Sequence, residues 1–170
     1  MLQVFDSWAG ELSPVSFKTH SLPYLTYISD NLPKRLAELG LERVPMTVFA
    51  KGAWYAVEDL CNTSYDVVGL DWLHDPAEAY KIARAKGKTL QGNADPGVLY
   101  GTREAITAVV EKMVDGFGRG KQGWIANLGH GTHSIRDLIC PLLTFFSGIT
   151  PLVKPDDLKF YFEEIHRLTK

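Results

Sequence analysis

The chain has 170 residues, of which 45% are hydrophobic, with a formal net charge of -2 and a pI near 6.2. This length suits one globular domain, and the small negative charge predicts no nucleic-acid partner. The two cysteines, Cys61 and Cys140, are far apart in the sequence, which predicts a reducing compartment and neither a disulfide framework nor a zinc site.

The N-terminal residues MLQVFDSWAG contain no basic segment followed by a long apolar stretch, so we expect no signal peptide. The apolar run at residues 138–146 is about half of the ~20 residues that a membrane span needs, so we predict no membrane partner. The first strand begins at residue 1 or 2 without a polar lead-in. We therefore expect this chain to be cut inside a larger domain.

The predicted elements alternate between strand and helix along the chain. Apolar segments predict strands at residues 2–5, 45–50, 65–72, 88–96 and 123–131. Apolar residues three and four apart predict a helix over 17–39, which Gly40 ends, and a second helix follows over 54–62. Asp75 and Pro76 begin a helix that Gly87 ends, Thr102 caps one over 103–118, and the last covers 156–170.

Apolar strands that alternate with helices indicate an α/β fold with a parallel sheet covered on both faces. Each strand ends in a polar or glycine-rich loop, and in a (β/α)8 barrel these ends build the active site. A complete barrel needs about 250 residues, so the five βα units indicate either an open doubly wound sheet or part of a barrel. No G-x-G-x-x-G follows the first strand, which disfavours dinucleotide binding.

Candidate site residues follow the strands: Asp6, Ser7, Lys51, Asp71, Gln91, Asn93, Asp95, Asn127 and His130. Ser7 is either an N-cap or turn residue, or a hydroxyl that holds an acidic substrate group. His130 lies between two glycines, which let a ligand approach the backbone and leave the imidazole as the side chain there. The alternative for His130 is a packing residue at the strand end.

Three of these candidates have a structural interpretation that we prefer. Asp71 is expected to be a buried acceptor of backbone N–H groups, while Asn93 and Asp95 are expected to shape the loop before Pro96. The sequence contains no Ser-His-Asp motif, H-E-x-x-H or P-loop. We therefore predict a site without a metal or cofactor, made of hydrogen-bond donors and glycine-opened backbone.

Five segments, in this order and spacing, resemble the C-terminal half of the uroporphyrinogen decarboxylase family: LQVFDSWAGELSP, VPMTVFAKG, YDVVGLDW, TLQGNADPGVLYG and IANLGHG…ITPLVKPDDLKFYFEEIHRL. The resemblance covers residues 1–170 except 132–148. It implies a distorted (β/α)8 barrel, of which this chain carries the last five βα units, and a homodimer. It also implies a cytoplasmic enzyme, or a plastid one in a photosynthetic eukaryote.

The implied reaction removes four acetate carboxyl groups from uroporphyrinogen III to give coproporphyrinogen III, for haem or chlorophyll synthesis, without a cofactor. The serine of the family's F-[DE]-S motif is Ser7, and the histidine of N-L-G-H-G is His130; both are expected to bind substrate. The family's central aspartate, its carboxylate-binding arginines and its tyrosine precede this segment. We therefore expect the 170-residue chain alone not to be a competent decarboxylase.

Two other functions stay open at this point. A methyltransferase of the same superfamily, of the cobalamin or methionine-synthase type, would use zinc held by histidine and cysteine, and a zinc measurement would distinguish it. An inactive truncated product is the non-enzyme alternative, which an upstream coding segment carrying the first strands would support.

Residues 132–148, THSIRDLICPLLTFFSG, interrupt the resemblance, and deleting them gives NLGHGITPLVKPDDL with the family spacing. We interpret them as an insertion, and the hypothesis we prefer is an intron translated in frame. The codon of Gly131 can contain the GT of a splice donor site. The residues PLLTFFS can be encoded by pyrimidine-rich codons like those before a splice acceptor site, and the codons of Ser147 and Gly148 can supply its AG. The alternative is a lid or membrane-touching loop, although an exposed apolar run of this length would be unusual.

Overall fold

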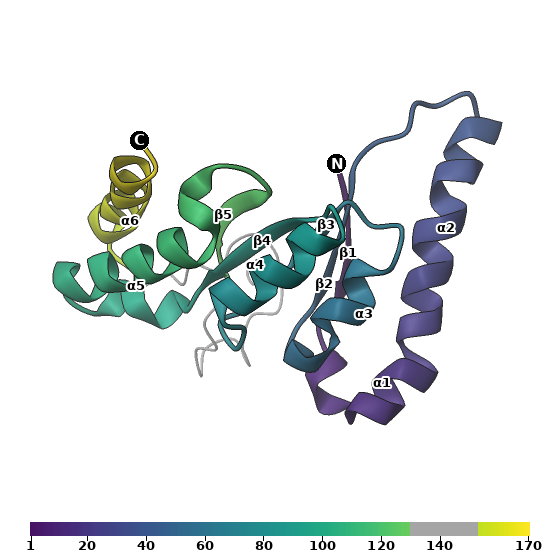
Figure 1. Ribbon diagram of the computed structural model, residues 1–170, viewed down its shortest axis with the longest axis horizontal. Coiled ribbons are helices and arrows are strands. Elements are labelled where there is room, and N and C mark those ends of the chain that lie inside the picture. Colours follow the sequence, from purple (N-terminus) through teal and green to yellow (C-terminus); the bar gives the residue numbers. More distant parts are fainter. Residues whose placement is uncertain (130–152) are drawn as a thin grey trace.

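The computed structural model describes residues 1–129 and 153–170 (Figure 1). One five-stranded sheet contains β1 (Leu2–Asp6), β2 (Met46–Ala50), β3 (Val67–Gly69), β4 (Thr89–Ala94) and β5 (Trp124–Leu128) in chain order. All neighbouring strands are parallel, which confirms the α/β prediction. The order never reverses, as it would in a doubly wound sheet, so the arrangement is that of a barrel segment.

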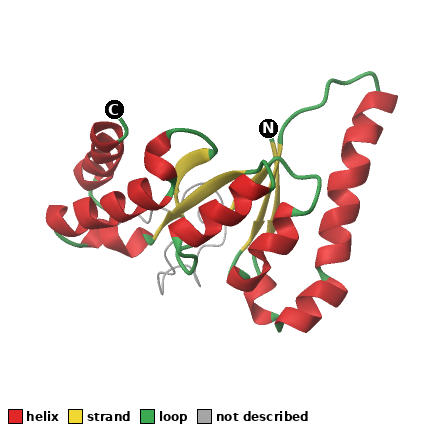
Figure 2. Ribbon diagram, in the orientation of Figure 1, coloured by secondary structure: helices red, strands yellow, loops and turns green. Residues whose placement is uncertain are grey.

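Helices connect the strands and follow the sheet from one end to the other (Figures 1 and 2). They are α1 (Pro14–His20), α2 (Leu22–Glu38), α3 (Val57–Cys61), α4 (Pro76–Ala85), α5 (Arg103–Gly116) and α6 (Pro155–Leu168). Short 3-10 helices, η1 (Ala9–Glu11), η2 (Trp54–Ala56), η3 (Pro96–Tyr100) and η4 (Gly118–Gly120), lie in the connections. Within the described residues, no helix is long and apolar enough to cross a membrane.

The two faces of the sheet differ. On one face, apolar strand residues such as Val48, Val68 and Leu90 pack into a core with the helices. The opposite face carries a row of paired residues, Phe5, Phe49, Gly69, Gln91 and Ile125. The middle of this row is covered, but Phe5 is 60% exposed at one end and Ile125 is 40% exposed at the other. The prediction of a sheet covered on both faces is therefore wrong at its two outer strands.

Three predicted elements differ from the structure. The helix expected over 17–39 is two helices, α1 and α2, which meet at Ser21. Pro23 explains the break, because a proline has no N–H to donate to the carbonyl four residues earlier and its ring crowds that carbonyl. The helix expected over 54–62 is η2 followed by α3, and the strand expected over 65–72 pairs only at β3.

The predicted helix caps are confirmed. The Asp75 carboxylate accepts from the first N–H groups of α4, and the Thr102 hydroxyl accepts from Ala105 N at 3.3 Å at the start of α5. Gly40 follows α2 with φ +70°, and Leu41 N donates to Leu36 O at 2.9 Å. Side-chain caps and a left-handed glycine therefore fix these helix ends.

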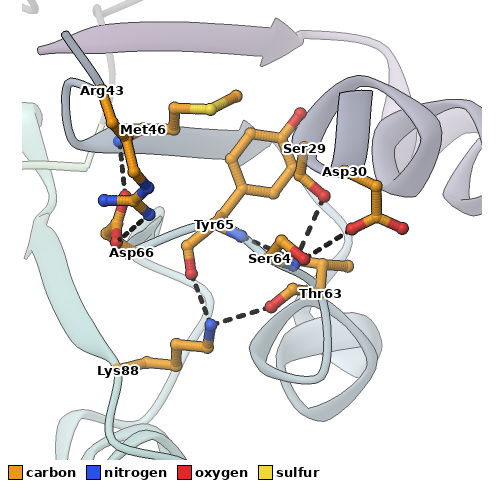
Figure 3. Close-up of polar contacts among 9 residues, drawn as sticks. All are labelled: Ser29, Asp30, Arg43, Met46, Thr63, Ser64, Tyr65, Asp66 and Lys88. Atoms are coloured by element: carbon orange, nitrogen blue, oxygen red, sulfur yellow. Dashed lines mark hydrogen bonds and ion pairs between the residues drawn. The ribbon is translucent and has the colours of Figure 1, made fainter. Parts of the chain in front are cut away.

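A polar network fixes the amino ends of the strands (Figure 3). Asp66, just before β3, accepts from Met46 N at 2.8 Å and from the Arg43 guanidinium at 2.7 Å. Burial alone would raise the pKa of Asp66, but the hydrogen bonds from Arg43 and Met46 hold it below its usual value. Asp66 therefore ties the starts of β2 and β3 together as a charged group.

Three further hydrogen bonds extend this network to β4 and α2 (Figure 3). Lys88 Nζ, before β4, donates to the carbonyls of Thr63 at 2.8 Å and Tyr65 at 2.6 Å. The Ser64 hydroxyl donates to Asp30 on α2 at 2.5 Å. Structural bonds thus occupy the amino ends of the strands, and the candidate functional residues follow the carboxyl ends.

Candidate functional site

The carboxyl edge is the end of the sheet formed by the residues that directly follow or end the strands: Asp6 and Ser7, Lys51 and Gly52, Asp71 to His74, Asn93, and Asn127 to Gly129. Lys51 N donates to Asp6 O at 3.0 Å, and Gly10 N donates to Lys51 O at 2.8 Å. The loops after β1 and β2 are therefore joined by backbone bonds on both sides of Ser7.

Asp71 is the most connected side chain of the carboxyl edge. It is 2% exposed, and its carboxylate accepts from Gly52 N at 2.5 Å and Leu73 N at 3.0 Å. His74 Nδ1 lies 3.1 Å from the same carboxylate. The prediction that Asp71 is a buried acceptor of backbone N–H groups is confirmed.

The charge of Asp71 depends on these partners. Burial alone would raise its pKa, but the hydrogen bonds from His74, Gly52 and Leu73 bring the pKa below its usual value. Asp71 is therefore held as a carboxylate in a place where an unpaired charge would be costly. Its role in the described residues is to fix the loops after β2 and β3.

Asn93 and Asp95 shape the loop after β4, as expected. Asn93 Nδ2 donates to Asp71 O at 3.1 Å and to His74 O at 2.9 Å, which joins β4 to the loop after β3. The Asp95 carboxylate accepts from Gly97 N at 2.8 Å and caps η3.

Two glycine contacts bring these loops together. A Cβ on Gly10 would lie 2.7 Å from Gly52 Cα, and a Cβ on Gly129 would lie 2.7 Å from Trp72 N. These distances are shorter than a side chain allows, so the backbones touch directly. The carboxyl edge is consequently a set of interlocked loops, even though each loop comes from a different βα unit.

The other predicted residues lie in different surroundings. The Asp6 carboxylate accepts from the hydroxyl of Ser21, the residue between α1 and α2, at 2.5 Å. Gln91 has a buried side-chain oxygen without a hydrogen-bond partner in the described part of the chain. Asn127 is exposed on β5, and its carbonyl accepts from the Tyr161 hydroxyl at 3.3 Å.

Ser7 lies in the exposed turn after β1, which agrees with its interpretation as a turn residue. It is not the N-cap of α1, because Ser13 has that role and accepts from Ser16 N at 3.1 Å. His130, Cys140 and the segment 132–148 lie outside the described residues. The structure thus places Ser7 beside Lys51 and does not test the expected substrate binding by Ser7 and His130.

His74 is the residue of this edge that the sequence reasoning missed. Its side chain is 6% exposed and paired with Asp71. The spacing Asp-x-x-His at a strand end was the available signal. Residues 1–129 and 153–170 contain no group of three His, Cys, Asp or Glu side chains that could hold a metal ion.

Sequence comparisons with known proteins agree on one family. The sequence model described as Uroporphyrinogen decarboxylase (URO-D) matches residues 1–138. The uroporphyrinogen decarboxylase of Schizosaccharomyces pombe is 48% identical over 167 residues, which is 98% of this chain and 42% of the relative. Those of Danio rerio and Homo sapiens are 51% and 44% identical over 137 and 136 residues, each about 36% of the relative. The chain therefore spans about two fifths of the length of these relatives.

A solved structure shows the same fold. A methyltransferase from Methanosarcina mazei superposes with a TM-score of 0.69 at 13% sequence identity. The match covers 99% of this chain and 42% of the methyltransferase chain. At this identity the likeness concerns the fold, and it supports a partial barrel.

Proposed function

Because this chain belongs to the uroporphyrinogen decarboxylase family, we propose that it supplies the C-terminal part of a (β/α)8 barrel that decarboxylates uroporphyrinogen III. Four acetate side chains would each lose carbon dioxide and become methyl groups, giving coproporphyrinogen III. The observation that carries this proposal is the family match over residues 1–138. The interlocked polar loops of the carboxyl edge support it, because barrel active sites lie at these strand ends.

The proposed reaction sets clear demands on the site. Protonation makes the pyrrole ring an electron sink, and the bond between the acetate methylene and its carboxylate breaks to release carbon dioxide. The methylene carbon then takes up a proton, and the ring loses the proton that it had gained. Such a site must bind many carboxylates, stabilise a positive macrocycle and position an acid. Ser7 and His130 are proposed to bind substrate, on the basis of their positions in the two matching motifs.

The rest of the site is proposed to come from the remainder of the barrel. This chain spans about two fifths of the matched relatives, and the central aspartate, arginines and tyrosine are expected in the preceding part. We also propose a homodimer and a cytoplasmic location, with the plastid as the alternative; the family resemblance alone supports these. Haem or chlorophyll synthesis would use the product, and no cofactor is proposed.

We further propose that the working enzyme lacks residues 132–148. The family match ends at residue 138, inside this segment, and the spacing on either side becomes that of the family when the segment is deleted. Transcripts that always retain the segment would argue against this. In the full-length enzyme, the form without the segment should bind and convert porphyrinogen, and equal turnover by both forms would refute the proposal.

Anaerobic turnover tests the proposed activity. The chain without 132–148 is combined with the N-terminal part of the Schizosaccharomyces pombe relative, and the products are separated by their number of carboxyl groups. Stepwise conversion of uroporphyrinogen III is expected for the combined protein and strong loss for its Ser7→Ala variant. Conversion by the 170-residue chain alone would disprove the need for the rest of the barrel, and a soluble, folded combination without turnover would disprove the activity.

A further inference from the structure

Lys51 lies directly beside Ser7 at the carboxyl edge. Its backbone N–H continues the pairing of β1 with β2 by donating to Asp6 O at 3.0 Å, and its carbonyl accepts from Gly10 N at 2.8 Å. These two bonds bracket Ser7 in the sequence. Any group that contacts the Ser7 hydroxyl therefore comes close to the start of the Lys51 side chain.

The alternation of β2 assigns Lys51 to the inner face of the sheet. Ala50 is buried in the core with the helices, whereas Phe49 lies on the opposite face, where its ring contacts that of Phe5 at a centroid distance of 6.3 Å. Side chains alternate between faces along a strand. Lys51 follows Ala50 and therefore extends from the same face as Phe49.

Lys51 also differs in charge from the residues around it. In the described loops that follow β1 to β4, it is the one Lys or Arg side chain. His74, in the loop after β3, is already bonded to Asp71. A polyanionic ligand at this edge would therefore meet the positive charge of the Lys51 side chain.

The backbone that carries Lys51 is held firmly. The next residue, Gly52, donates to the buried carboxylate of Asp71 at 2.5 Å and touches Gly10 on its other side. A cation on a fixed backbone loses less conformational freedom on binding than one on a loose loop. The surroundings of Lys51 are therefore those of a binding residue in a preorganised loop.

We propose that Lys51 binds a side-chain carboxylate of the tetrapyrrole substrate, with the Ser7 hydroxyl as a neighbouring donor to the same group. This inference rests on the proposed function, which supplies a substrate with several acetate and propionate carboxylates. A lysine ammonium suits this task as a point charge that can follow a carboxylate. Lys51 is thus a specificity-determining residue that favours substrates with more carboxylates.

The test uses the combined protein of the turnover assay, which lacks residues 132–148, and uroporphyrin III, the stable oxidised form of the proposed substrate, with binding followed by fluorescence. Lys51→Gln should raise the Kd about tenfold, the usual effect of losing a charged hydrogen bond. Lys51→Arg should recover most of the affinity. Lys34→Gln, which removes an exposed charge on α2, is the matched control and should bind as the unchanged chain does.

Salt dependence separates a direct charge contact from a loss of structure. Added salt should weaken uroporphyrin binding by the unchanged chain more than binding by Lys51→Gln, because screening acts on the ammonium. Equal affinities and equal salt slopes would overturn the inference, as would an unchanged combined protein that does not bind uroporphyrin. Neither result decides the proposed function, which the turnover assay with the combined protein tests separately.

Discussion

The backbone N–H of Gly52 donates a hydrogen bond of 2.5 Å to the carboxylate of Asp71, and this contact joins the loops after β2 and β3. The same Gly52 lies against Gly10 in the loop after β1. One buried charge and one glycine contact therefore set the relative positions of three loops. The positions of Ser7 and Lys51, which these loops carry, therefore depend on both contacts.

Replacing Asp71 should destabilise the protein. Asp71→Ala leaves the partly buried N–H groups of Gly52 and Leu73 without their acceptor and the buried His74 side chain without its partner. This should lower the free energy of unfolding by about 3 kcal/mol. Urea denaturation measures the change. Asp115→Asn is the control, because that carboxylate is 62% exposed in its ion pair with Arg119 and should cost less than about 1 kcal/mol. Equal losses in the two variants would show that Asp71 does not hold these loops.

Acid should destabilise the protein through the same residue. The pKa of Asp71 is lower in the folded protein than the ordinary value of about 3.9 expected in the unfolded chain. Stability from this group is therefore complete above about pH 5 and is lost as the pH falls toward the folded pKa. Thermal unfolding between pH 7 and pH 3 should show a shallower acid loss in Asp71→Asn than in the unchanged protein. Parallel curves would contradict the prediction.

Glycine substitution can separate close packing from backbone conformation. Gly52 and Gly87 both have positive φ, +78° and +66°, but an added Cβ meets Gly10 Cα at 2.7 Å in the first case and nothing within 4 Å in the second. Gly87→Ala should cost about 1 kcal/mol, from the left-handed conformation alone. Gly52→Ala should cost about 2 kcal/mol more, because overpacking must push two backbones apart, and should weaken uroporphyrin binding as well. Similar losses in both variants would rule out the loop contact as the cause.

The sequence predicts the fold and the edge that carries the site better than it predicts the contacts within that edge. Apolar strands followed by polar or glycine-rich loops identify all five βα units, because strand burial leaves a local pattern. The choice between a doubly wound sheet and a barrel segment depends on strand order, which no local pattern encodes. The pairing of Asp71 with His74 was missed for a related reason, since a short loop must fold back before an Asp-x-x-His spacing becomes a contact.

Ser7 was identified from the sequence, but its neighbour was not. Its motif resembles that of the family and its turn position was among the expected alternatives, yet the sequence does not give its neighbour. Lys51 lies beside it because β1 and β2 pair in a register with Asp6 opposite Ala50. Register arises from the packing of whole strands, so such a neighbour can be assigned only from the structure.

Lys88 should stabilise the amino ends of the strands without any part in binding. Its Nζ donates to Thr63 O at 2.8 Å and Tyr65 O at 2.6 Å (Figure 3), so Lys88→Met leaves two carbonyls without this donor. We expect a loss of about 2 kcal/mol in the free energy of unfolding, measured by urea denaturation. Lys86→Met, at the exposed end of α4, should change stability by less than about 0.5 kcal/mol. Uroporphyrin binding by folded Lys88→Met should equal that of the unchanged protein, because Lys88 lies at the amino ends of the parallel strands and the proposed site lies at their carboxyl ends. If Lys88→Met kept full stability but lost uroporphyrin binding, Lys88 would belong to the binding site and not to the contacts that hold the amino ends of the strands.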